Sequence, residues 1–206
     1  MSGIQITERD IELLKGINRW GFVDIDYISR WFQWQPKLAY RRCRKLIQEN
    51  YLQHEWIFYG EPGVYRVTQQ GVLMSHDHLP PLRKINVATY HHHLKVAKLA
   101  LRLVEQHKGE FITERDLRHQ LGINGLDDKQ HISDGILVKN DQRIAIEVEL
   151  TVKSESRLKK ILQHYRKEFS IQGVWYFCGT QEVKNKLDSL IHNTDFIKTH
   201  LLQKEN

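Results

Sequence analysis

Residues 131–153, HISDGILVKNDQRIAIEVELTVK, contain four carboxylates, and three of them, Asp134, Glu147 and Glu149, are candidates for a common site. Asp134 precedes a glycine, and one residue separates Glu147 from Glu149. In RIAIEVELT, apolar residues alternate with Arg, Ala and the two glutamates. This period of two predicts a strand with one apolar face and both glutamates on the other. Carboxylate oxygens are hard ligands that suit Mg²⁺ or Mn²⁺, so the pattern indicates a divalent-metal site.

A hairpin would bring these carboxylates together. Asn140-Asp141 is the predicted tight turn between its strands. A loop centred there places Asp134 directly opposite Glu147, with Glu149 further along the same face. Opposed side chains have Cβ atoms about 4.5–5.5 Å apart, where like charges repel each other. A bridging cation would remove this repulsion. The alternative is a solvent-facing strand whose acidic residues pair with nearby lysines.

Residues 5–75 predict the order helix, helix, helix, strand, turn, strand. Thr7 is the expected N-cap of the first helix, and Pro36 lies in the first turn of the third, PKLAYRRCRKLIQEN. The strands fit EWIFYG and VYRVT, separated by a turn at GEPG. This order, with phrases such as KLIQENYL and VYRVTQQG, resembles a winged-helix DNA-binding domain.

The third helix is rich in cations. No acidic residue occurs from Tyr27 to Gln48. Several cations recur at spacings of three and four residues, so they share a helix face. We predict that this helix docks in the major groove of double-stranded DNA. The predicted DNA-binding residues are Lys37, Arg41, Arg42, Arg44 and Lys45. The alternative is a solvated basic face on a helix that touches only protein.

Composition sets the broad class of the protein. The 206 residues are 40% hydrophobic and 27% charged, with a net charge of +6, which favours a polyanionic partner. Cys43 and Cys178 are far apart and lack CxxC spacing, so we expect a reducing cytoplasm and neither a disulfide nor a zinc framework. No apolar run approaches the roughly 20 residues that cross a bilayer, so no membrane association is expected.

Residues 76–89, HDHLPPLRKINVAT, predict a linker, and residues 90–203 a second domain. A helix, two strands, a basic helix and the strand GVWYFC follow one another there, which resembles the PD-(D/E)XK nuclease core. The resemblance implies that Asp134 and Glu147 hold Mg²⁺ beside a scissile phosphate. Glu149 occupies the usual lysine position as a further ligand or water-orienting base, and Lys153 is the candidate replacement for that lysine.

Two further residues have competing interpretations. Glu114, in FITERDLRHQ, is a candidate metal ligand because many such nucleases add a glutamate from a preceding helix. Helix capping with Thr113 as N-cap explains the same segment. Tyr165 could be the nucleophile of a tyrosine-based relaxase, although packing in the core is the favoured interpretation.

The whole chain is expected to be α+β, with a winged helix-turn-helix followed by a PD-(D/E)XK-like domain. HHHLKVAKLAL, FITERDLR, SDG and IEVELTVKS resemble the replication-relaxation family, which includes MobC-type mobilisation relaxases of plasmids. This resemblance implies metal-dependent nicking at an origin of transfer, or an accessory role beside other relaxosome proteins. The competing hypothesis is a catalytically inactive DNA-binding regulator. A homodimer remains open in either case.

Overall fold

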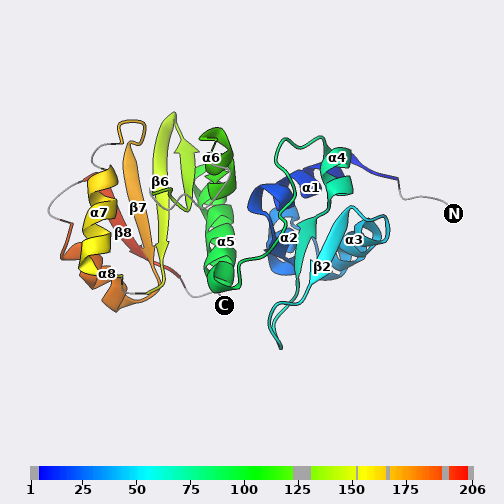
Figure 1. Ribbon diagram of the computed structural model, residues 1–206, viewed down its shortest axis with the longest axis horizontal. Helices are drawn as coiled ribbons and strands as arrows, with labels where there is room; N and C mark the ends of the chain where they lie inside the picture. Colours follow the sequence, from blue (N-terminus) through cyan, green and yellow to red (C-terminus); the bar gives the residue numbers. More distant parts are fainter. Residues whose placement is uncertain (1–4, 123–130, 152, 166–167, 192–194, 204–206) are drawn as a thin grey trace. The chain divides into compact units, whose positions relative to one another are not determined.

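The computed structural model describes residues 5–122, 131–151, 153–165, 168–191 and 195–203. It is a mixed α+β structure with two sheets and, within these residues, eight α-helices (Figure 1). The expected α+β class is therefore confirmed. The chain divides into two compact units, residues 1–101 and 102–206. Among the described helices, none combines the length and apolar character that a membrane crossing requires.

Unit 1 begins with three helices and continues into a small antiparallel sheet in the order β1-β3-β2. Its first elements are α1 (Glu8–Trp20), β1 (Val23–Asp24), α2 (Ile25–Phe32), α3 (Pro36–Gln48), β2 (Leu52–Glu55), β3 (Val64–Val67) and α4 (Gln69–Ser75). Thr7 is the N-cap of α1, as predicted, and its backbone N–H donates to the Asp10 carboxylate at 2.7 Å. Pro36 lies in the first turn of α3, also as predicted.

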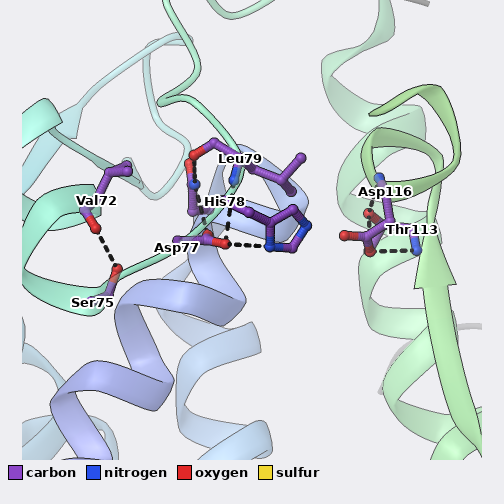
Figure 2. A network of polar contacts seen from close by, with 8 residues as sticks. Val72, Ser75, Asp77, His78, Leu79, Thr113 and Asp116 are labelled. Carbon is purple, nitrogen blue, oxygen red and sulfur yellow. Dashed lines mark hydrogen bonds and ion pairs between the residues drawn. The ribbon is translucent and has the colours of Figure 1, made fainter. Parts of the chain in front are cut away.

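The segment expected to be a linker is fastened to unit 1. Leu79 and Ile85 are buried, and Asn18 Nδ2 donates to the Leu79 carbonyl at 2.7 Å and to Asp77 Oδ2 at 2.8 Å. Figure 2 shows the Asp77 carboxylate, which contacts the His78 ring and accepts a hydrogen bond from the backbone N–H of Leu79. The segment ends in a 3-10 turn, η1 (Val87–Thr89). Helix α5 (Tyr90–His107) follows, and the boundary between the two units falls within it, after residue 101.

Unit 2 is built on a five-stranded sheet in the order β4-β5-β6-β7-β8. After α5 its elements are β4 (Glu110–Thr113), α6 (Glu114–Gln120), β5 (Gly135–Lys139), β6 (Gln142–Glu149), α7 (Glu155–Tyr165), β7 (Gly173–Cys178), α8 (Gln181–Asp188) and β8 (Ile197–Leu201). The pairs β4–β5 and β5–β6 are antiparallel, whereas β6–β7 and β7–β8 are parallel. The short strand β4 was not predicted, because the segment ITERD was interpreted only as the start of a helix.

Strand β6 is buried on both faces. On one face Ala145 packs with β7 and with the apolar residues of α7 and α8. On the other face Ile144, Ile146 and Val148 are buried as well. The glutamates of β6 share the face of Ala145, and both are almost inaccessible. The alternative of a solvent-facing acidic strand is therefore wrong. Helix α7 covers this face, and sequence alternation alone does not reveal that cover.

Candidate functional site

The predicted register of the β5–β6 hairpin is confirmed. Gly135 pairs with Ile146 and Lys139 with Gln142, so the turn residues are Asn140 and Asp141. Both turn residues have positive φ, 47° and 60°, as a two-residue turn between twisted strands requires. The next opposed position beyond the ladder belongs to Asp134 and Glu147.

Asp134 is held against the neighbouring strand. Its Oδ2 accepts a hydrogen bond of 2.7 Å from the backbone N–H of Val148. This bond crosses from the start of β5 to β6 and fixes the carboxylate beside Glu147. Gly135 leaves no room for a side chain next to it, because an added Cβ would lie 2.2 Å from the Phe111 ring. The Asp-Gly pair is thus explained by close packing at this end of the hairpin.

Glu147 lies in a buried hydrogen-bonded network. Its side chain is 6% exposed, its Oε1 accepts a hydrogen bond from the Tyr165 hydroxyl, and His131 Nε2 lies 2.7 Å from the same oxygen. His131 Nε2 is also 3.2 Å from the Tyr165 hydroxyl. Burial raises the pKa of Glu147, the His131 hydrogen bond lowers it and the Asp134 charge raises it, with a net upward shift. His131 was not among the residues predicted from the sequence, although its position three residues before Asp134 could have indicated it.

Glu149 forms an ion pair with Lys153. Lys153 Nζ lies 2.5 Å from Glu149 Oε2, with side-chain exposures of 25% and 5%. The contact lacks the angles of a directional hydrogen bond. The structure therefore brings together the glutamate at the usual lysine position of the motif and the lysine suggested as a replacement.

Tyr176 adds a buried hydroxyl to the same face. It is the β7 partner of Glu147 in the parallel ladder, and it is 1% exposed. Burial raises its pKa, and the charges of Glu147, Glu149 and Asp134 raise it further. Its hydroxyl has no hydrogen-bond partner among the described residues. The Tyr176 hydroxyl is thus an unsatisfied buried polar group close to the carboxylates.

The donor types fit a divalent cation, since three carboxylates and a hydroxyl supply hard oxygens. In the part of the chain that the structure describes, no group of three or more His, Cys, Asp or Glu side chains is arranged to hold a metal ion. The reason is visible in the contacts above: Val148 N–H, the Tyr165 hydroxyl and Lys153 each engage one of the carboxylates. The contacts of Tyr165 and His131 both involve Glu147 Oε1, whereas Lys153 contacts Glu149 Oε2, so a metal at Glu149 Oε2 would have to displace Lys153.

Glu114 is the first residue of α6, and its Oε1 accepts a hydrogen bond of 2.8 Å from Arg118 Nε. Its side chain is 45% exposed. Thr113 is the N-cap of this helix, as predicted, and its N–H donates to Asp116 Oδ2 at 3.0 Å (Figure 2). Thr113 pairs with Gly135, which brings the start of α6 beside Asp134. Glu114 thus pairs with Arg118 on its own helix, and its backbone follows the residue that pairs with Gly135.

The cations of α3 divide into two kinds. Lys37, Arg41, Arg44 and Lys45 are exposed, and within the described part of the chain none forms an ion pair. Arg42 differs, because its guanidinium binds the Asp10 carboxylate with Nε 2.5 Å from Oδ1. Asp10 is 1% exposed. Burial raises the pKa of Asp10, but the bonds from Arg42 and Thr7 outweigh this and lower it overall. Arg42 thus joins α3 to α1.

Comparison of the chain with protein-family models, with curated proteins and with solved structures found no match in any of the three.

Proposed function

We propose that this protein is a metal-dependent DNA endonuclease or nickase. The observation that carries the proposal is the cluster on β5 and β6. Asp134 and Glu147 are opposed at one end of the hairpin, and Glu149 lies on the same buried strand with Lys153 at its side. Burying two carboxylates on one strand raises the free energy of the folded chain unless a ligand or partner compensates, so a functional reason is indicated.

The arrangement of unit 2 supports a PD-(D/E)XK-like fold within this proposal. After α5, which spans the unit boundary, the order is strand β4, the short helix α6, the antiparallel strands β5 and β6, the crossover helix α7 and the parallel strand β7. Asp134 stands at the start of the second strand and Glu147 near the end of the third, which are the positions the resemblance implies. In unit 1, three helices followed by a β-hairpin support a winged helix.

Asp134, Glu147 and Glu149 would hold Mg²⁺ or Mn²⁺, and Glu114, which follows the Thr113 partner of Gly135, would be a further ligand if it left Arg118. When bound, the ion supplies a Lewis acid for the phosphate and lowers the pKa of an attacking water. Lys153, beside Glu149, would stabilise charge that develops on the phosphate. Tyr165 and His131 both contact Glu147 Oε1 and would hold that carboxylate in position. A nucleophilic role for Tyr165 is therefore not part of this proposal.

Unit 1 would dock the enzyme on duplex DNA. Four exposed cations on one helix, which form no ion pair with the residues that the structure describes, provide the positive surface that phosphates require. Under this proposal the protein acts in the cytoplasm on an origin of transfer, beside other relaxosome proteins, as the resemblance to the replication-relaxation family implies. Arg42 is left out of the proposed interface because Asp10 already binds it.

A second candidate is a catalytically inactive DNA-binding accessory protein. It is favoured by the protein donors that already engage the carboxylates, and by the glutamate at the usual lysine position. In that case the cluster would be a structural network inside unit 2. Binding by α3 would be the same in both candidates, so binding alone does not separate them.

Nicking of supercoiled plasmid that carries an origin of transfer separates the candidates. The assay compares wild type, Asp134→Asn and Glu147→Gln in Mg²⁺, Mn²⁺ or EDTA, with Asp141→Asn in the hairpin turn as the matched control. We expect metal-dependent open circles from wild type and from the control, and none from the two site variants. Tight, salt-sensitive DNA binding without any nicking by wild type would favour the accessory protein.

A further inference from the structure

The connection between β2 and β3 presents two large aromatic side chains to solvent. Trp56 is 73% exposed, and Tyr59 is fully exposed. In Figure 1 this connection extends away from the helices of its own unit. Exposed rings of this size lose the free energy that burial would give, about 25 cal/mol per Å² of apolar surface. Two such rings exposed on one connection therefore favour a binding partner that covers them.

The same connection is anchored between the two rings. Ile57 and Phe58 pack against the core cluster of Phe22, Val64, Ile85 and Tyr90. The Phe58 ring stacks on the His91 ring at 5.0 Å. Ile57 and Phe58 thus pack toward the core, whereas Trp56 and Tyr59 on either side of them are exposed to solvent. The backbone that carries the exposed rings is therefore anchored to the core at Ile57 and Phe58.

The Trp56 ring also contacts a neighbouring side chain, His54. Its ring meets the His54 ring edge-on, with centroids 4.3 Å apart. His54 has room to do this because Gly63 lies beneath it; a Cβ at Gly63 would lie 2.4 Å from His54 Nε2. A flat indole face is left open to solvent. Rigid aromatic rings lose little conformational entropy when they bind a flat partner.

The surroundings of the two rings are basic. Arg66 donates to the backbone carbonyls of Leu82 and Arg83, which brings that segment alongside β3. Arg83 and Lys84 are exposed there, and Leu82 packs on the same core cluster as Phe58. The two acidic side chains that flank the rings each face a basic partner: Arg66 engages Glu55, and Glu61 Oε1 lies 3.6 Å from His91 Nε2. Open rings beside cations suit a negatively charged chain of flat bases.

We propose that this β2–β3 hairpin binds unpaired DNA bases, which stack on Trp56 and Tyr59 while Arg83 and Lys84 contact the phosphates. In duplex DNA the base faces are covered by neighbouring bases, so exposed faces occur only where strands separate. The cations of α3 bind duplex, and the hairpin adds a preference for a junction between paired and unpaired DNA. The inference rests on the proposed function only in taking DNA as the partner, and it is independent of cleavage.

The test is fluorescence anisotropy of the full chain in EDTA with two labelled substrates, a forked duplex with unpaired arms and a fully paired duplex of the same sequence. Trp56→Ala and Tyr59→Ala remove the rings, whereas Trp56→Phe and Tyr59→Phe keep a ring. Leu73→Ala, at an exposed apolar residue of α4, is the control. Each alanine variant should weaken forked binding by roughly 5- to 150-fold, since stacking contributes about 1–3 kcal/mol per base. Duplex binding, the phenylalanine variants and the control should match wild type.

Equal losses on both substrates would overturn the proposal, because the rings would then contact duplex grooves. Unchanged binding of both would overturn it too, and would assign the hairpin to a protein partner. Failure of wild type to bind either substrate would overturn the inference together with the DNA-binding part of the proposed function. Normal forked-DNA preference without nicking would leave this inference standing and refute only the proposed catalysis.

Discussion

Two tyrosines in the carboxylate site provide a matched pair for testing its geometry. Tyr165 and Tyr176 are both buried next to Glu147, and each becomes phenylalanine by loss of one oxygen. The Tyr165 hydroxyl donates to Glu147, whereas the Tyr176 hydroxyl has no hydrogen-bond partner among the described residues. Identical changes should therefore have opposite effects on the stability of unit 2.

Loss of the Tyr165 hydroxyl leaves a buried carboxylate oxygen with fewer donors, and this costs about 1–3 kcal/mol. Loss of the Tyr176 hydroxyl removes an unsatisfied polar group, so stability should stay constant or rise by up to about 1 kcal/mol. Amide hydrogen exchange in peptides from β6 and β7 measures the opening free energy of this unit directly. Exchange there should be roughly 5- to 150-fold faster in Tyr165→Phe and no faster in Tyr176→Phe.

The same change in exchange in both variants would contradict the contacts assigned to the two hydroxyls. Equal destabilisation would mean that the Tyr176 hydroxyl has a partner in solution that the structure does not show. Equal neutrality would mean that Tyr165 does not hold Glu147, and the positioning role given to it would be lost. Exchange in peptides from α1 and α3, in the other unit, serves as the internal control.

Arg44→Ala should lower the slope of log affinity for duplex DNA against log salt by about 1, and Arg9→Ala on α1 should leave it unchanged. For Asp10, whose folded pKa is lowered, the stability it contributes is present above its unfolded pKa of about 3.9 and is lost as pH falls through the folded pKa. Thermal melts from about pH 6 to pH 2 should therefore fall more steeply for wild type than for Asp10→Asn, and parallel curves would contradict this. Lys153→Ala leaves the buried Glu149 carboxylate unpaired and should lower the free energy of unfolding of unit 2 in urea by about 2–4 kcal/mol. Lys184→Ala breaks a more exposed pair at the same spacing and should lower it by only about 0.3–0.5 kcal/mol.

The hairpin of unit 2 could be predicted in detail because its signals are local. Asn140 and Asp141 tolerate positive φ, so the turn has one preferred position. Once the turn is placed, the two-residue period of the strands determines which side chains are opposed. The helix N-caps at Thr7 and Thr113 were predictable for the same reason, since each depends on a side chain three residues further on.

The cover over the carboxylates was not predictable in this way. Whether β6 exposes or buries its glutamates depends on where α7 lies, and that depends on the parallel pairing of β6 with β7. His131 and Tyr165 reach Glu147 from positions 16 and 18 residues away. Neither separation is a spacing that a strand or helix period would identify.

The cations of α3 illustrate the same limit at the scale of one residue. Arg41 and Arg42 are neighbours with identical side chains, and both were predicted to bind DNA, although the group at three- and four-residue spacing, Lys37, Arg41, Arg44 and Lys45, did not include Arg42. Arg42 is nevertheless bound by Asp10, 32 residues earlier, whereas Arg41 is exposed. Composition counts both charges toward DNA binding, but a guanidinium held by a buried carboxylate must break that pair before it can reach a phosphate. The number of cations available to DNA is therefore a property of the packing of α1 against α3, and a count of basic residues overstates it.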